Sequence, residues 1–143
     1  MEFNYFDIMM RAQKAYARVM DPICKQWELT RNELDVLLFL ANNPEYDRAS
    51  DIVLNRGIAK SHVSLSVTNL EAQGLLLRQP DSEDRRTVHL KLTGDAWKIA
   101  EAGQEAQQRF FSRLHHGVSQ EELNHWRAFT RKVGENIKNM EEM

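Results

Sequence analysis

Short polar side chains recur along one face of the segment 58–73, and they are of a kind that can contact bases. Val63, Val67 and Leu70 follow at steps of four and three, which predicts an amphipathic helix with these residues facing a core. The exposed side then carries Lys60, Ser61, His62, Ser64, Leu65 and Thr68. An α-helix fits the major groove, where such groups meet base edges. Leu65 has two open interpretations, contact with a thymine methyl or ordinary exposure.

Two adjacent arginines lie in a polar segment between two predicted strands. Residues 75–79 predict the first strand, and residues 87–92 alternate apolar and polar side chains as a second strand does. The segment 80–86 between them predicts a charged hairpin loop with Arg85 and Arg86 at its tip. Arginines in this position can reach a phosphate or the minor groove.

The remaining elements predict a helical frame around this helix and hairpin. A helix over 6–24 should break or kink near Pro22, and Thr30 with Glu33 predicts a capping box for a second helix. Asp47 is expected to cap a short third helix that Gly57 ends. A long helix should follow to about Leu114, and Ser119 with Glu122 should open the last one. The fold class is therefore mainly α with a small β-hairpin wing, a winged helix-turn-helix.

Length and composition are those of one globular domain, or of one domain with helical extensions. The 143 residues carry 19 basic and 21 acidic side chains, a net charge of −2, which argues against a globally basic nucleic-acid binder. Residues 48–98 hold eight basic and six acidic side chains, so the local balance supports DNA binding only slightly. The longest apolar run is too short to span a membrane. One cysteine and no secretory pattern predict a cytoplasmic protein without disulfides.

The segments 30–40, 59–64 and 70–78 together resemble the MarR family of bacterial transcriptional regulators. The wing signature of that family matches at Asp84, Arg86, Leu92 and Thr93, at the right distance after Leu-Glu-x-x-Gly-Leu. The resemblance implies a homodimer on pseudo-palindromic double-stranded DNA. It also implies recognition residues around Ser61 to Thr68, a wing arginine in the minor groove, and Asp84 as a residue that supports the wing.

The resemblance raises three further interpretations. A pocket for a small aromatic or lipophilic effector would lie between the dimer helices and the DNA-binding lobe; its candidate lining is Tyr16, Met20, Trp27, Phe39 and Trp97. Cys24 could sense oxidants, but an apolar neighbour favours a packed thiol. His115, His116 and His125 invite a zinc site, but adjacent histidines at a helix end point in different directions, so no metal and no cofactor is expected.

Apolar residues on the terminal helices predict the dimer interface. They are Phe6, Met9, Leu123, Trp126, Val133, Ile137 and Met140. Accordingly, residues 1–29 and 94–143 are expected to form a helical dimerisation region, and residues 30–93 the DNA-binding lobe.

The function predicted from the sequence is sequence-specific DNA binding by a ligand-responsive repressor, without enzymatic activity. No phosphate loop, nucleophile elbow or zinc-protease motif is present in the sequence. Two alternatives remain: a winged-helix module that binds another protein, and a redox-responsive regulator that senses through Cys24. The effector and the operator sequence are not readable from the residues.

Overall fold

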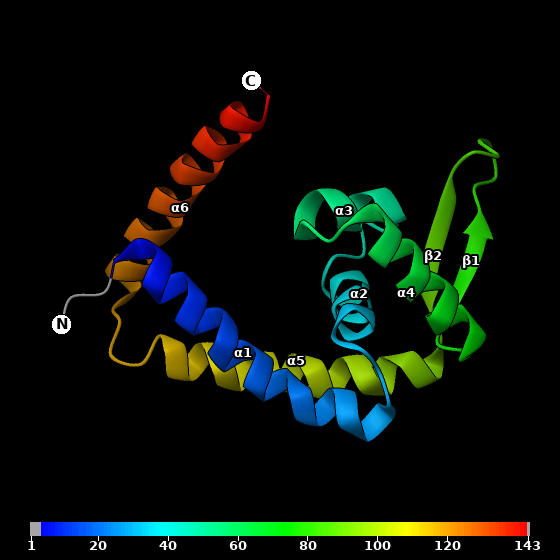
Figure 1. Cartoon of the computed structure of the whole chain (residues 1–143), viewed down its shortest axis with the longest axis horizontal. Coiled ribbons are helices and arrows are strands. Elements are labelled where there is room, and N and C mark those ends of the chain that lie inside the picture. Colours follow the sequence, from blue (N-terminus) through cyan, green and yellow to red (C-terminus); the bar gives the residue numbers. More distant parts are fainter. Residues whose placement is uncertain (1–3, 143) are drawn as a thin grey trace. The chain divides into compact units, whose positions relative to one another are not determined.

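The computed structural model describes residues 4–142, which form six helices and one β-hairpin (Figure 1). In chain order the elements are α1 (Tyr5–Trp27), α2 (Arg31–Asn42), α3 (Ala49–Arg56), α4 (Lys60–Ala72), β1 (Leu76–Pro80), β2 (Val88–Leu92), α5 (Gly94–Leu114) and α6 (Gln120–Glu141). The strands are antiparallel, with Leu76 opposite Leu92 and Pro80 opposite Val88. The predicted fold class, mainly helical with a hairpin wing, is confirmed.

The break of the first helix that was predicted near Pro22 does not occur. The helix continues through Pro22 to Trp27 and ends at Glu28, which has left-handed backbone angles (φ 55°). Proline removes one helical hydrogen bond. Burial of Met20 and Ile23 on either side of it offsets that loss, because both side chains lie in the core.

Helix α2 begins as its sequence predicts, but α3 does not. The amide of Glu33 donates to Thr30 Oγ1 over 3.1 Å, and the amide of Thr30 donates to Glu33 Oε1 over 3.0 Å, which completes the capping box. Asp47 does not cap α3. Arg48 is the N-cap residue, its amide donates to Asp51, and the Asp47 side chain instead contacts β2. Gly57 ends α3 with φ +65°, as expected.

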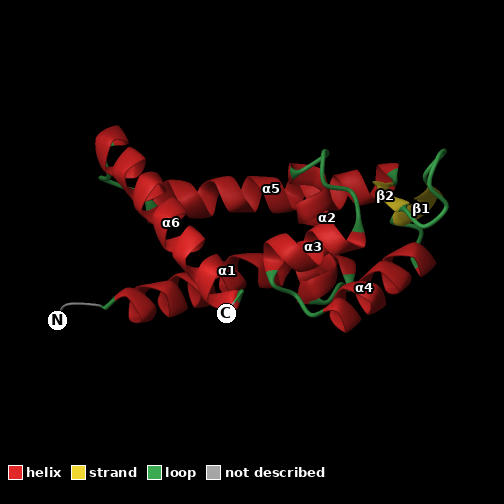
Figure 2. Cartoon of the chain, turned by 90° about the horizontal axis from the view of Figure 1, so that it is seen from above, coloured by secondary structure: helices red, strands yellow, loops and turns green. Residues whose placement is uncertain are grey.

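One hydrophobic core joins the first five helices and the hairpin. Helix α2 is its centre and contacts α1, α4 and β2, while α3 contacts α4 (Figure 2). The fully buried side chains include Leu34, Leu37, Ile52, Val63 and Leu76. Met20 of α1 and Ile99 of α5 belong to the same core, so packing crosses both predicted limits of the lobe 30–93.

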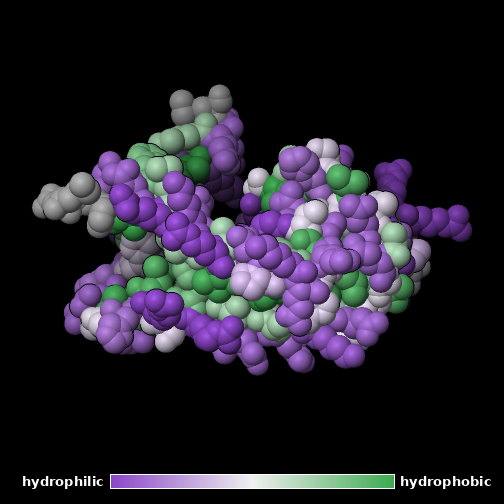
Figure 3. Space-filling view, turned by 60° about the horizontal axis from the view of Figure 1, so that its bottom comes forward, coloured by the Kyte–Doolittle hydropathy of each residue, from purple (hydrophilic) through white to green (hydrophobic). Residues whose placement is uncertain are grey.

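The chain divides into two compact units, one up to Phe110 and one from Phe111. Within the second unit, the rings of Trp126 and Phe129 stack with centroids 6.0 Å apart. Helix α6 has no buried residue over its described length. The predicted interface residues Phe6, Met9, Trp126, Ile137 and Met140 are exposed, and Leu123 and Val133 are half-buried. Apolar side chains reach the surface in Figure 3, drawn in green.

The predicted boundaries at residues 1 and 143 lie outside the described residues, and the division into dimerisation region and lobe stays a prediction. Within residues 4–142, no helix is both long enough and apolar enough to cross a bilayer.

Candidate nucleic-acid interface

Helix α4 is held against the body of the protein by one buried face. Val63, Ser66, Val67 and Leu70 are all buried. Asn69 adds a polar contact on the flank, because its Nδ2 donates to Oε2 of the buried Glu33 of α2 over 3.3 Å. Burying a carboxylate is costly unless it accepts hydrogen bonds, and Glu33 accepts from both Asn69 and Thr30. These contacts fix which face of α4 looks outward.

The outward face of α4 carries the predicted recognition residues. All six of them, Lys60, Ser61, His62, Ser64, Leu65 and Thr68, are exposed. At about 100° per residue, Ser61, Leu65 and Thr68 form the central outward row. Lys60 and Ser64 lie on the flank that faces the hairpin. Leu65 is 60% exposed, although it is a large apolar side chain.

Arg78 of β1 joins this face and was missed in the sequence analysis. Its Nη2 donates to Thr68 Oγ1 over 3.1 Å, and its Nε lies 3.5 Å from Glu71 Oε1. The turn at Gly74, with φ +75°, returns the chain so that β1 contacts α4. A basic residue four positions after such a turn is the only sequence signal that points to this contact.

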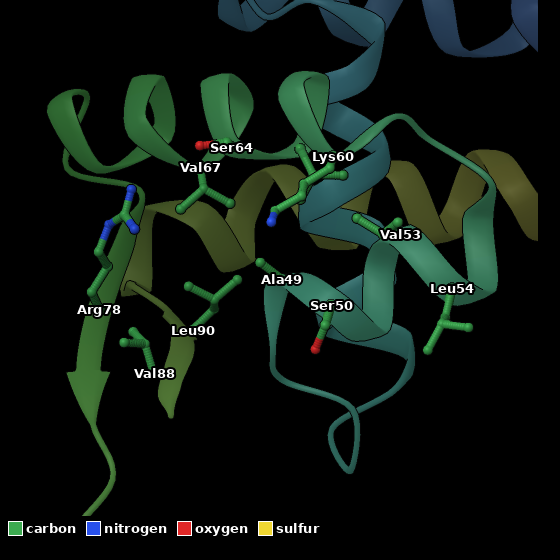
Figure 4. Close-up of a pocket in the computed structure, with 11 residues that line it drawn as sticks. Ala49, Ser50, Val53, Leu54, Lys60, Ser64, Val67, Arg78, Val88 and Leu90 are labelled. Carbon is green, nitrogen blue, oxygen red and sulfur yellow. The ribbon is translucent and has the colours of Figure 1, made fainter. Parts of the chain in front are cut away.

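A groove of about 410 Å³ lies between α3, α4 and the two strands (Figure 4). Its lining is mostly apolar and includes Val53, Val67, Val88 and Leu90. Ser50, Lys60, Ser64 and Arg78 supply its polar groups, and the Lys60 and Arg78 side chains extend into the groove below α4. Two basic side chains, Lys60 and Arg78, thus border one groove beside the recognition helix.

The loop between the strands is shaped by two aspartates. Asp81 Oδ2 accepts the amides of Glu83 (3.1 Å) and Asp84 (2.9 Å). Asp84 accepts the amide of Arg86 through Oδ1 (3.0 Å) and the hydroxyl of Thr87 through Oδ2 (3.1 Å). Hydrogen bonds of this kind fix a tight turn. Arg85 and Arg86 therefore sit exposed on an ordered loop tip.

His89 ties this wing to the segment before α3. Its Nδ1 lies 2.7 Å from Asp47 Oδ1, and its Nε2 lies 2.7 Å from Asp81 Oδ1. The hydrogen bonds to Asp47 and Asp81 raise the pKa of His89 above its ordinary 6.5. The hydrogen bond from His89 lowers the pKa of Asp81 to about 2. Burial would raise the pKa of Asp47, but hydrogen bonds from His89 and Lys91 bring that pKa below its usual value.

Four of the five residues predicted to line an effector pocket lie in or against the hydrophobic core. Met20 and Phe39 are core residues, Tyr16 and Trp27 pack against the core, and Trp97 is exposed. None of these five lines the groove beside α4. Tyr16 Oη accepts from Gln107 Nε2 over 2.8 Å.

Neither the cysteine considered as an oxidant sensor nor the histidines considered as a zinc site have surroundings that support those roles among the described residues. Cys24 is half-buried, and burial raises the pKa of its thiol, which lowers the thiolate fraction near neutral pH. Within residues 4–142, no three His, Cys, Asp or Glu side chains gather as a metal site would require.

A helix with a buried face and a polar outward face, followed by a hairpin with a cationic tip, defines a winged helix-turn-helix protein. Comparison with known proteins extends this assignment. Residues 27–87 match the model of the MarR family. The HTH-type transcriptional regulator FarR of Neisseria gonorrhoeae is 30% identical over 103 residues, which cover 71% of this chain and 70% of FarR. The chain therefore belongs to the MarR family of transcriptional regulators.

Two further similarities agree with that membership. The HTH-type transcriptional regulator PecS of Dickeya dadantii (strain 3937) is 28% identical over 128 residues, covering 85% of this chain and 75% of PecS. The MepR–DNA complex of S. aureus superposes with a TM-score of 0.79 at 21% identity, over 94% of this chain and 97% of MepR. The second similarity is one of fold.

Proposed function

We propose that this protein is a sequence-specific, double-stranded DNA-binding repressor that acts as a homodimer on a pseudo-palindromic operator. The observation that carries the proposal is the exposed polar face of α4 beside an ordered wing whose tip is Arg85 and Arg86. Family membership supports it, and the fold is shared with MepR in a DNA complex. As a regulator of transcription it would act in the cytoplasm, and we assign it no catalytic step.

The roles at DNA divide between α4 and the wing. Ser61, Ser64, Leu65 and Thr68 would face base edges, with Lys60 and His62 at the margins of the same helix. Arg85 and Arg86 would contact phosphates or the minor groove, and Asp84 would hold their loop. We add Arg78, because its guanidinium contacts the Thr68 hydroxyl and reaches the groove between helix and wing.

Dimerisation and effector binding complete the proposal. The exposed apolar residues of α1 and α6, among them Phe6, Trp126 and Ile137, would be covered by a second copy. Two recognition helices would then meet half-sites about 34 Å apart. A small aromatic or lipophilic effector, bound near Tyr16, Met20, Trp27, Phe39 and Trp97, would act by its difference in affinity for two conformations.

Selection of duplexes from a random-sequence pool tests this function directly. We expect enrichment of an inverted repeat, and fluorescence anisotropy should show binding to the enriched duplex about 10³-fold or more above a scrambled duplex. Equal affinity for both duplexes would contradict sequence-specific regulation. Binding to neither, together with an exposed wing that captures a protein, would favour the protein-interaction alternative.

A further inference from the structure

His89 connects three segments that are distant in sequence. It stands on β2, its partner Asp81 begins the wing loop, and its partner Asp47 precedes α3. The amide of Leu90 donates to the carbonyl of Asp47 over 2.7 Å, so the backbone fixes the same junction. The imidazole is about a quarter exposed and the Asp47 side chain about a fifth. This side-chain bridge is a connection between the wing loop and the helical body.

The two contacts of His89 require the protonated ring. Both ring nitrogens face carboxylate oxygens at 2.7 Å, and an ionised carboxylate only accepts hydrogen bonds. Imidazolium donates through both nitrogens, whereas neutral imidazole donates through one and presents a lone pair to the other carboxylate. Deprotonation therefore replaces one charge-assisted hydrogen bond with a repulsive contact.

The charged groups around the ring favour protonation. Asp47 approaches from the segment before α3, and Lys91 of β2 lies 3.3 Å from the second Asp47 oxygen. Asp81 approaches from the wing loop. The acidic residues Glu83 and Asp84 of that loop donate their backbone amides to Asp81. From β1, the cross-strand neighbour of His89 is the uncharged Gln79.

We propose that protonated His89 locks the wing onto the segment before α3 and so positions Arg85 and Arg86, which makes DNA affinity fall as pH rises. The part of this proposal that concerns affinity rests on the proposed DNA-binding function. His89 is a positioning residue: it acts through Asp81, whose other oxygen holds the amides of the loop that carries the arginines.

The direction of the pH effect follows from the pKa of His89. A pKa above 6.5 in the folded protein means that the lock is fully formed below about pH 6.5. It is lost as pH rises through the pKa of the folded protein. One linked proton limits the dependence to about tenfold in affinity per pH unit. Deprotonation of His89 thus loosens the wing without any ligand.

The free protein tests the lock without DNA. Histidine ring shifts measured by NMR from pH 5 to 9, with His89→Gln used for assignment, should give a pKa for His89 above 6.5. Amide exchange of residues 82–87, corrected for intrinsic rates, should accelerate several-fold as His89 deprotonates. An ordinary or lowered pKa, or loop protection that does not change with pH, would overturn the lock.

Asp81→Asn is the variant that separates positioning from simple charge. Its amide oxygen can still accept the amides of Glu83 and Asp84, while its NH₂ group donates to the unprotonated Nε2 of neutral His89. Neutral His89 can then form a hydrogen bond with Asp47 and with the new amide side chain at the same time. We expect the pH dependence of loop protection and of DNA affinity to vanish or reverse in this variant. If charge alone mattered, Asp81→Asn would bind DNA more tightly by the same factor at every pH, and its affinity would depend on pH as that of the wild type does.

DNA affinity is measured by anisotropy from pH 6 to 8.5 at constant ionic strength, on the duplex selected with wild-type protein. Wild type should lose affinity as pH rises, and His89→Gln should give a flat, weak profile. His125→Gln, on α6, is the matched control and should keep the wild-type slope. A full wild-type slope in His89→Gln would overturn the proposal. If no duplex is enriched, the proposed function fails, while the NMR and exchange results still decide the lock.

Discussion

Individual side chains at the interface divide into those that a base can meet and those that hold other groups in place. Leu65 and Ser61 are exposed on the outward row of α4. Thr68 lies on the same row, but its hydroxyl already accepts from Arg78. Its proton remains available for donation, so Thr68 and Arg78 would contact DNA as a pair. The backbone turn that Asp81 and Asp84 form holds Arg85 and Arg86 in place.

The Arg86→Ala variant should weaken binding to specific and scrambled duplexes by the same factor. A phosphate contact contributes affinity without base information, and its loss should flatten log affinity against log salt by about one unit. Anisotropy on both duplexes across a salt series measures this slope. Arg86→Lys keeps the charge and should keep the slope. A loss confined to sites with a narrow, A·T-rich minor groove would instead place the guanidinium in that groove.

Leu65 should contact the methyl group of a thymine in the operator. An exposed leucine on a recognition face has a matching apolar partner in the major groove only at thymine. Replacing that thymine with deoxyuridine should cost wild-type protein about 0.8 kcal/mol, or about fourfold in affinity. Leu65→Ala should bind the thymine and uracil duplexes equally. If replacing each thymine in turn with deoxyuridine never lowers the affinity of the wild-type protein, Leu65 is an exposed residue without a base contact.

At the scale of elements, α4 is oriented by what surrounds it. Helix α2 contacts it on one side, α3 braces it through the buried Ile52, and β1 lies beside it. Helix α5 in turn packs against α2 at Gly103, where a β-carbon would lie 2.6 Å from Leu38 Cδ2. The glycine therefore permits a close approach of α5 to α2, and α2 in turn contacts the recognition helix.

Gly103→Ala should destabilise the protein. Overpacking a core costs about 1–3 kcal/mol, and the higher helix propensity of alanine returns at most about 1 kcal/mol. Gly94→Ala is the matched control, because Gly94 begins the same helix, α5, with nothing within 4 Å of the added methyl group. That control should gain up to about 1 kcal/mol in the free energy of unfolding measured with urea. An equal gain in both variants would show that Leu38 moves aside without cost.

At the scale of the whole molecule, the terminal helices expose apolar side chains that a binding partner would cover. Trp126, Ile137 and Met140 of α6 are each about half exposed or more, as is Phe6 of α1. Single exposed apolar residues are common, but a repeated set on one helix marks an interface. Cyclic dimers are the commonest assemblies, and a dimer would pair two copies of α4 with two half-sites.

Wild-type protein should sediment as a dimer at micromolar concentration, and Ile137→Glu should sediment as a monomer or aggregate. The substitution buries an unpaired carboxylate in the apolar interface. Asn139→Glu adds the same charge about 200° around the helix and should leave the dimer intact. Wild-type protein that sediments as a monomer at this concentration would contradict the homodimer.

Sequence patterns that span one or two helical turns determined where several helices and strands form and which of their faces are buried. The period of Val63, Val67 and Leu70 predicted which face of α4 is buried, and Thr30 with Glu33 predicted where α2 begins. The alternation of residues 87–92 predicted the second wing strand, which is observed at Val88–Leu92. These features depend on neighbours close in sequence, so one sequence suffices to read them.

Only the tertiary structure decided the contacts between distant segments. Asp47 has the residue type of a helix cap, yet it lies beside β2 and pairs with His89, 42 positions away. Arg78 meets Thr68 only because β1 returns along α4, and α1 runs through Pro22 because the core buries Met20 and Ile23. A side chain with several possible partners takes the one that packing brings near, and packing depends on the whole chain. The bridge between wing and helical body is therefore a property of the fold, which the sequence pattern by itself left hidden.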